Sequence, residues 1–531
     1  MSRRPTRGDY YRRRTLVALA LVSVVAIAVS IGMDGAGGGG GTAKGSSSTS
    51  STVKVRKGEY FASNAKVLAD PKGFRKPYPN ATMEGLLTFR GNPSRSYYGL
   101  GPVPSQPKVL HKFPSEPMCR TSENLGTTKV WCGMGWTGQP LIVERKDRRW
   151  AIFGGYDGHI HFMDALTGER ILPDVETGDI IKGTPTMDPD GLPLVYSGSR
   201  DNYLRIIAID RPGAAEVLWK LDSESVKPTL WNDDWDSSPL VFGDYLVEGS
   251  ESSRFWVIKL NKHLDAAGLV QVDPKVVFTT EAWDEDALAQ DGDLDASVES
   301  SVAVYNDTVY FGTSAGLVLG YDLSGIQQGA KPKKVFRFFS GGDIDPSVVV
   351  DDKGFLYVAE EYDRPLARSR EVGQLTKLDP SNTLNPIVWK IDEAPGLKGG
   401  IYGTPGINGN VVYVATNSGR LVAVDRTTGT ILWERRLPPP TWGSPVIVDD
   451  TLLIGDCQGD FHAFDVSDPL HAPPEKWSIH LGGCIEATPA VWKGRIYIGT
   501  RAGHLYILGD GDATTGTSST KASTTSSTKQ P

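Results

Sequence analysis

The sequence contains little cysteine and methionine and only one long hydrophobic run. Four Cys and seven Met in 531 residues exclude a disulfide-dense small scaffold and a Met-rich binding surface. Outside that run no long stretch shows helical periodicity, so we predict an all-β fold. The 13 Trp, 19 Tyr and 16 Phe provide enough bulky side chains for one large closed core.

A basic surface is also lacking. The chain has 56 Lys and Arg against 63 Asp and Glu, a net charge of −7. The first 33 residues hold six Arg and one Asp, which leaves 50 basic and 62 acidic residues in the rest, a net charge of −12. Because phosphate backbones need a basic surface, we predict no nucleic-acid partner.

The hydrophobic run predicts a membrane anchor. It extends from Leu16 to Met33 directly after Arg12, Arg13 and Arg14, and its length matches the hydrocarbon core of a bilayer. Arg residues hold their end of such a helix in the cytoplasm. We therefore predict a basic cytoplasmic tail (1–14) and a single-pass signal-anchor in the cell membrane (15–33), with the bulk of the chain extracytoplasmic in a bacterial envelope. A signal peptide cleaved near Ala28 is the alternative.

Low-complexity segments frame the predicted folded body. Residues 34–83 begin Gly/Ser-rich and continue Lys/Pro-rich, which predicts a flexible and then irregular linker. Residues 511–531 are Ser/Thr-rich and predict a disordered tail. The folded body is expected at 84–510.

An internal repeat dominates the body. A small residue and usually Pro open a strand, a strand ending in a Gly, Asn or Asp turn follows, then a strand ending in Asp, and then a strand with Trp. The openings lie 40 to 63 residues apart, as in propeller blades. They are Gly138–Pro140, Gly183–Pro185, Ser237–Pro239, Ser300–Val302, Ile344–Pro346, Gly403–Pro405, Gly443–Pro445 and Ala487–Pro489. We predict an eight-bladed β-propeller.

The last repeat unit stops at Leu508, one strand short of a complete unit. Residues 107–113 (PKVLHKF) form a lone strand pattern with no unit before them. Pairing this segment with the last unit would close the ring and remove two exposed sheet edges. We therefore predict that an N-terminal strand completes the last blade.

The repeats resemble those of quinoprotein-like (PQQ-repeat) β-propellers, which include quinone-dependent alcohol dehydrogenases and BamB-type outer-membrane assembly factors. The resemblance is carried by Tyr310–Asp322, Tyr413–Trp433 and Tyr497–Leu508, and by the lead-in Phe89–Pro93. It covers about residues 86–508 and implies the fold. It implies little about function, because this fold serves unrelated roles.

The quinone chemistry of that family is not expected here. The family's dehydrogenases hold a metal through Glu and Asn, use an Asp base, sandwich the quinone against Trp and carry two adjacent Cys. No two Cys are adjacent in this sequence, and no Glu/Asn/Asp set matches residue by residue. We predict no PQQ and no other cofactor, with calcium as the one metal ion that carboxylates in the body would suit.

The four cysteines predict two structural disulfides, because thiols oxidise outside the cytoplasm. Cys119 and Cys132 flank a short excursion, and Cys457 and Cys484 lie in neighbouring repeat units. The second pair would join adjacent blades near the closure. A metal site is the alternative, but no C-x-x-C spacing supports it.

The strongest functional signal is positional. The first residues of the innermost strands ring one mouth of a propeller channel. The residues three before the Pro position, which we call the ring positions, are Thr137, Lys182, Asp236, Glu299, Asp343, Tyr402, Trp442 and Glu486. Crowded carboxylates must bind a cation, pair with Lys182 or take up a proton, and aromatic rings beside acids suit carbohydrate or cationic ligands. The alternative is a merely hydrated polar channel.

A second acidic region lies at Trp231–Asp236 and Glu281–Asp295, where we expect solvated loops, with a calcium site or a surface for a basic partner as alternatives. Three functions remain. The preferred one is a non-catalytic, membrane-tethered module that binds an extracytoplasmic protein or envelope polymer. The others are a quinone- or metal-dependent dehydrogenase and a polysaccharide hydrolase or lyase that uses ring carboxylates.

Overall fold

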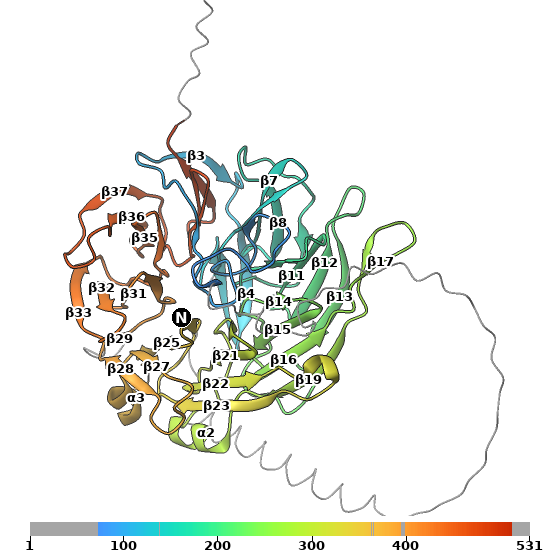
Figure 1. Ribbon diagram of the computed structural model, residues 1–531. Helices are drawn as coiled ribbons and strands as arrows, with labels where there is room; N and C mark the ends of the chain where they lie inside the picture. Colours follow the sequence, from blue (N-terminus) through green and yellow to red (C-terminus); the bar gives the residue numbers. More distant parts are fainter. Residues whose placement is uncertain (1–72, 137, 363, 365, 394–398, 512–531) are drawn as a thin grey trace, which may run out of the picture.

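The computed structural model describes residues 73–511 except 137, 363, 365 and 394–398. Eight sheets form a closed ring within these residues (Figure 1), which confirms the eight-bladed β-propeller. The predicted cytoplasmic tail, the anchor at 15–33, the linker up to residue 72 and the tail after 511 lie outside the described residues. No helix in the described part of the chain has the length and apolar character to cross a bilayer.

Each blade contains four antiparallel strands, numbered from the axis outward. Blade 1 contains β6 (Leu141–Arg145), β7 (Arg148–Gly154), β8 (His159–Asp164) and β9 (Val175–Glu176). Blade 2 contains β10 (Thr186–Met187), β11 (Leu194–Ser197), β12 (Tyr203–Ala208) and β13 (Glu216–Asp222). Blade 3 contains β14 (Leu240–Phe242), β15 (Tyr245–Ser250), β16 (Arg254–Lys259) and β19 (Lys275–Glu281). Blade 4 contains β20 (Ala303–Tyr305), β21 (Thr308–Gly312), β22 (Leu317–Asp322) and β23 (Lys333–Phe339).

The second half of the ring follows the same plan. Blade 5 contains β24 (Val349–Val350), β25 (Leu356–Ala359), β27 (Leu375–Leu378) and β28 (Ile387–Ile391). Blade 6 contains β30 (Gly406–Asn408), β31 (Val411–Ala415), β32 (Arg420–Asp425) and β33 (Ile431–Arg436). Blade 7 contains β34 (Val446–Val448), β35 (Thr451–Gly455), β36 (Asp460–Asp465) and β37 (Glu475–His480). Blade 8 contains β38 (Ala490–Trp492), β39 (Arg495–Gly499), β40 (Leu505–Gly509) and β3 (Lys108–Phe113).

Blade 8 confirms the predicted closure. The early strand β3 pairs antiparallel with β40, and Lys108 lies opposite Gly509 and Phe113 opposite Leu505. The first and last parts of the described chain therefore share one sheet, as Figure 1 shows where blue β3 meets the red strands. This pairing covers the edge that the C-terminal strands would otherwise expose.

Short elements decorate the ring. They are the hairpin of β4 (Cys119–Asn124) and β5 (Thr127–Cys132), the pairs β17 (His263–Leu264) with β18 (Val270–Gln271) and β26 (Glu361–Tyr362) with β29 (Gly399–Gly400), the helices α2 (Glu285–Asp291) and α3 (Ala367–Val372), and the 3-10 turn η3 (Ile326–Gln328). Helix α2 corrects the expectation of a loop throughout Glu281–Asp295, because the Asp284 side chain accepts from the Ala287 backbone N–H and caps a helix there.

Residues 85–100, here called the axial segment, lie inside the innermost strands. Strand β1 (Gly85–Leu86) pairs antiparallel with β6 of blade 1, and β2 (Gly99–Leu100) pairs parallel with β38 of blade 8. The segment also bonds to the six blades between them, through Met187, Ser238, Val304, Val350, Ile407 and Pro445. Sequence reasoning placed the innermost strands at an open channel, and the axial segment corrects this picture.

Two arginines fasten the axial segment. The Arg90 guanidinium donates to the carbonyl oxygens of Thr404 (3.3 Å), Pro405 (2.9 Å) and Pro445 (3.2 Å). Arg95 donates to the carbonyl oxygens of Val302 and Ser238, in blades 4 and 3. Both side chains are fully buried, and burial lowers the pKa of Arg90 and lowers that of Arg95 to about 9. The lead-in around Phe89–Pro93 is thus a structural fastener.

The packed body begins before the expected boundary at residue 84. Tyr78 is 4% exposed and its hydroxyl donates to the Val241 carbonyl in blade 3. The Asn92 side-chain amide donates to the Lys76 carbonyl oxygen at 3.0 Å. Residues 73–83 therefore belong to the folded structure although their composition predicted linker.

Candidate functional site

A ladder of small polar side chains sets the height of the innermost strands. The Gln139 backbone N–H donates to Thr184 Oγ1 (2.8 Å), the Thr184 N–H to Ser238 Oγ (3.0 Å) and the Ser238 N–H to Ser301 Oγ (3.0 Å). The same bonds continue to the later blades through Ser347, Thr404 and Ser444. The Ser or Thr in the openings of blades 2 to 7 thus accepts a bond from the preceding blade, and the ring positions two residues earlier come to one end of the axis.

The ladder changes one predicted ring position. In blade 5 the ladder residue is Ser347, which follows Pro346, whereas in most other blades it precedes the Pro. Asp345 therefore occupies the ring position and Asp343 lies two residues behind it. Asp343 is 1% exposed, and the Glu361 N–H donates to its carbonyl oxygen at 2.8 Å. The alignment on Pro was wrong here because the Pro is shifted in this repeat.

A second layer of side chains lies next to the ring positions. Each comes from the turn after the second strand of a blade, where its backbone N–H donates to the chain just before the ring position. These second-layer residues are Tyr156, Arg200, Glu251, Ser314, Glu361, Asn417, Cys457 and Arg501. Sequence reasoning missed them as a set, although they occupy one repeat position, the residue after Thr in YVATNSG and YIGTRAG.

Blades 2 and 3 bring acidic and basic groups together. Lys182 forms an ion pair with Asp236, and its Nζ lies 3.5 Å from Glu251 Oε1. Arg200 Nε lies 2.5 Å from Asp234 Oδ2. Burial raises the pKa of Asp234 well above its ordinary value, with Glu251 adding to the effect and Arg200 opposing it. Lys182 thus pairs with a neighbouring carboxylate. The sequence had left open this pairing, the binding of a cation and the uptake of a proton.

Blades 4 and 5 hold a second acidic group. Arg364 forms an ion pair with Asp291, and its Nη2 lies 3.1 Å from Asp343 Oδ2. Burial raises the pKa of Asp345 well above its ordinary value, and the charges of Asp343 and Glu299 add to this shift. We call the side chains of both groups the acidic half of the ring. They are Lys182, Arg200, Asp234, Asp236, Glu251, Asp291, Asp343, Asp345 and Arg364.

Glu299 joins the two acidic groups. Burial raises its pKa to about 8, with Lys182 opposing the shift and Glu251, Asp295 and Asp343 adding to it. At neutral pH this carboxyl group is mostly protonated. Proton uptake at Glu299 therefore relieves part of the repulsion that crowded carboxylates produce.

Two sets of carboxylate oxygens could hold a cation. The ligand atoms of Asp234, Asp236 and Glu251 lie within 4.8 Å of one another, and so do those of Asp343, Asp345 and Glu361. Hard oxygen ligands of this kind suit Ca²⁺ or Mg²⁺. The first set already faces Lys182 and Arg200, and the second faces Arg364. The expected calcium ion stays a prediction.

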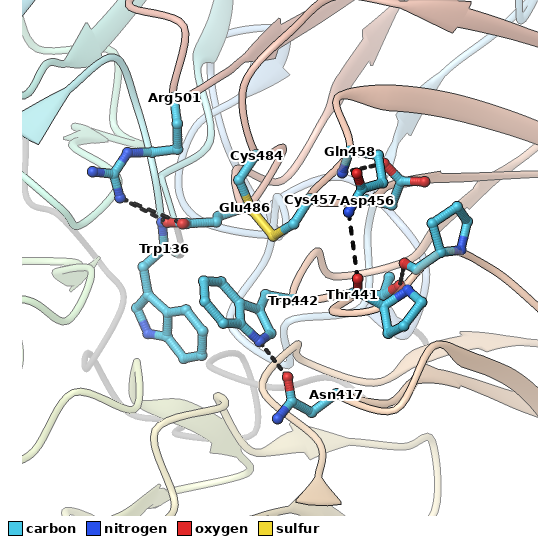
Figure 2. The surroundings of a disulfide bond; sticks show 12 residues. Trp136, Asn417, Thr441, Trp442, Asp456, Cys457, Gln458, Cys484, Glu486 and Arg501 are labelled. Carbon is cyan, nitrogen blue, oxygen red and sulfur yellow. Dashed lines mark hydrogen bonds and ion pairs between the residues drawn. A yellow bond between two sulfur atoms is a disulfide. The ribbon is translucent and has the colours of Figure 1, made fainter. Parts of the chain in front are cut away.

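The opposite side of the ring carries aromatic side chains. The Tyr402 and Trp442 rings stack with centroids 5.7 Å apart and an angle of 30° between their planes. Trp136 meets Tyr402 edge-on, also at 5.7 Å. All three are partly exposed, and we call them the aromatic wall. Figure 2 shows both indoles and the bond from Trp442 Nε1 to Asn417 Oδ1, at 2.7 Å.

Glu486 lies beside the aromatic wall and is paired with a second-layer residue. Its carboxylate accepts from Arg501 Nη1 at 3.3 and 3.4 Å and from the Trp136 backbone N–H at 3.5 Å (Figure 2). The Arg501 guanidinium also lies over the Trp131 ring, 4.9 Å from its centroid. Thr137, the remaining predicted ring position, lies outside the described residues.

The β4–β5 hairpin contacts both the acidic half and the side of the ring end that carries the aromatic wall. Its disulfide joins Cys119 to Cys132 as predicted. Near the base, Trp131 lies between the guanidinium groups of Arg200 (5.2 Å) and Arg501 (4.9 Å). Near the tip, Asn124 Oδ1 accepts from Asn232, whose amide also donates to Glu251. The hairpin therefore contacts blades 8, 2 and 3 at the ring end of the axis.

The second disulfide, Cys457–Cys484, is also confirmed. It joins the turn after β35 in blade 7 to the chain that leads into β38 in blade 8. Figure 2 shows it close to Glu486, two residues after Cys484. The bond therefore joins the blades that carry Trp442 and Glu486.

Comparisons with known proteins agree with this fold. A family model described as "Outer membrane protein assembly factor BamB" matches residues 372–530. The quinoprotein alcohol dehydrogenase PedE of Pseudomonas putida is 29% identical over 143 residues, 26% of this chain and 21% of that protein. BamB of Nitrosomonas eutropha is 32% identical over 114 residues, 20% of this chain and 24% of that protein. The chain thus spans about a fifth to a quarter of the length of these curated relatives.

Two solved structures extend the likeness to the whole ring. BamB from Moraxella catarrhalis has a TM-score of 0.50 at 18% identity and covers 74% of this chain and 100% of its own. A europium-containing methanol dehydrogenase has a TM-score of 0.51 at 13% identity and covers 80% and 98%. Identities this low show the fold alone. Together the matches confirm the resemblance to PQQ-repeat, BamB-like β-propellers.

Proposed function

We propose that this chain is an extracytoplasmic binding module that takes a protein or an envelope polymer at the ring end of the propeller and performs no chemistry. The observation that carries this proposal is that the axial segment joins the blades, while a different set of side chains gathers at the ring end. The axial segment hydrogen-bonds to all eight blades, while the ring end gathers aromatic and charged side chains that the fold does not need for closure.

The pairing of the ring carboxylates supports binding over catalysis. Lys182 faces Asp236, and Arg501 faces Glu486. A quinone site of the family's kind needs Glu, Asn and Asp groups free to hold a metal and abstract a proton, and these carboxylates are paired with cations. The disulfides join residues 13 and 27 positions apart, unlike the adjacent pair of the quinone enzymes. The pairing of Asp236 and Glu486 with cations and the separated cysteines therefore weigh against a quinone site.

The test is to isolate the full chain from its host envelope and to analyse it by native mass spectrometry and elemental analysis. A co-purifying protein or polymer that is lost in Trp442→Ala, but retained in Trp219→Ala on the outer strand β13, supports the proposal. Equal retention by both variants contradicts it. A quinone chromophore with alcohol turnover, as the name of PedE suggests for that relative, would replace it with a dehydrogenase.

A polysaccharide hydrolase is the second candidate, and Glu299 favours it. A glycosidase needs a protonated carboxyl group near an ionised one, and the raised pKa of Glu299 supplies the first. Glu299→Gln should then abolish release of reducing ends from envelope polysaccharide while the protein stays folded. Unchanged release, or no release by the unaltered protein, excludes this role.

A further inference from the structure

We propose that the aromatic wall binds a neutral polysaccharide of flat, gluco-type pyranose units. This inference rests on the proposed binding function and names the ligand class for the ring end. Tyr402 stacks on Trp442 and Trp136 meets Tyr402 edge-on, so three partly exposed rings adjoin one another. The axial C–H groups of a gluco-type sugar form an apolar face with positive edges, which suits the negative face of an aromatic ring.

The Trp136 indole Nε1 is buried and has no hydrogen-bond acceptor among the residues that the structure describes. A buried indole N–H ordinarily finds an acceptor. A sugar hydroxyl or ring oxygen at the edge of the Trp136 indole, in the plane of its ring, would supply one, whereas an apolar ligand would not.

The aromatic wall has a polar edge. Glu486 and Arg501 are paired beside Trp136, and Asn417 holds the Trp442 indole from the other side. Charged and amide groups next to aromatic faces bond the equatorial hydroxyls of a stacked sugar. The side-chain types at this place therefore complement both the face and the edge of one pyranose.

The carboxylates at the ring end favour neutral over anionic polymers. The acidic half closes the other side of the same ring end, where burial raises the pKa of Asp345 and Glu299 and the charges of neighbouring carboxylates add to the shift. A uronate or phosphate polymer that reached the aromatic wall would be repelled by these charges. Neutral sugars would not.

The experiment is isothermal titration of the full chain with cellopentaose, with chitopentaose and with a pentamer of galacturonate. The inference expects binding of at least one neutral pentamer and at least tenfold weaker binding of the anionic one. Trp442→Ala should weaken neutral binding at least tenfold. Trp136→Phe, which keeps a ring and removes the N–H, should weaken it about fivefold, as loss of one hydrogen bond implies.

Trp219→Ala, a substitution on outer strand β13, is the matched control and should leave the affinity unchanged. Near-ultraviolet circular dichroism establishes that each variant is folded. Binding of neither neutral pentamer, or equal effects of the Trp442 and Trp219 variants, overturns the inference. If the pentamers fail while Trp442→Ala still abolishes capture of an envelope protein, the polysaccharide inference is wrong and the binding function stands.

Discussion

The axial segment gives the sharpest test of how this propeller holds together. Arg90 is fully buried, and its guanidinium donates to the carbonyl oxygens of Arg95, Thr404, Pro405 and Pro445. The substitution Arg90→Met keeps most of the side-chain volume and removes every one of these donors. Four carbonyl groups from the axial segment and blades 6 and 7 are then left in the interior without this partner.

Each buried acceptor left unsatisfied costs about 1 to 3 kcal/mol, so four of them cost at least about 4 kcal/mol. Removing the buried charge returns part of this, because burial already lowers the pKa of Arg90 and so disfavours its charged form. We expect Arg90→Met to lower the free energy of unfolding by about 3 to 5 kcal/mol. That is a large part of the 5 to 15 kcal/mol that a folded domain typically has.

Equilibrium unfolding in urea, followed by tryptophan fluorescence, measures this loss. The control is Arg436→Met on the exposed side of β33, which should stay within about 0.5 kcal/mol of the unaltered protein. A loss below about 1 kcal/mol for Arg90→Met would refute the reasoning. It would mean that the axial segment packs without its guanidinium bonds.

Other predictions concern titration, the disulfide and calcium. Burial lowers the pKa of His161, but the bonds and charges of Asp157 and Asp174 outweigh it and raise that pKa. The stabilisation from protonated His161 is therefore complete below about pH 6.5 and is lost as pH rises through the folded-state pKa. His161→Asn should therefore reduce the change of the urea midpoint between pH 5.5 and pH 8.5. Glu299, with a pKa of about 8, makes the folded state less stable as pH rises from about 4.5 to 8. Glu299→Gln should remove this loss of stability and give a higher urea midpoint than the unaltered protein at pH 9. Removing the Cys457–Cys484 bond by Cys457→Ser with Cys484→Ser should cost about 3 kcal/mol, and an unchanged urea midpoint would contradict that role. Calcium at 1 mM should raise the melting temperature relative to a chelator, and Asp345→Asn should abolish the rise; no rise in the unaltered protein would remove the calcium prediction.

Much of the ring could be predicted from sequence because its repeat is local and regular. Short strands and Gly, Asn or Asp turns recur along the ring, and most units open with Ser-Pro or Thr-Pro. The last unit lacked one strand, so the single strand pattern at 107–113 could be assigned to it. The axial segment could not be predicted in this way. Arg90 and Arg95 bond to backbone carbonyl groups of the blades, which carry no side-chain signal, and these bonds join residues 143 to 355 positions apart.

The ring end was predictable in part, for the same physical reason. Lys182, Asp236, Tyr402, Trp442 and Glu486 fall on one repeat position, and the structure brings each next to another ring or second-layer residue. Asp343 was assigned to the ring position by aligning the repeats on Pro. In blade 5 the Pro precedes the ladder residue Ser347, so that alignment is two residues out of register. The partners Arg200 and Arg501 also lie on one repeat position, and aligning the turns would have found them.

The account depends most on one claim, that ligands bind at the ring end beside the aromatic wall. A photoreactive benzoylphenylalanine in place of Trp442 tests this in the intact envelope of the host, with the same residue in place of Trp219 on β13 as the reference. The account predicts that irradiation joins the chain to its ligand from position 442 and leaves position 219 unreacted. Equal labelling at both positions, or labelling from 219 alone, would contradict it.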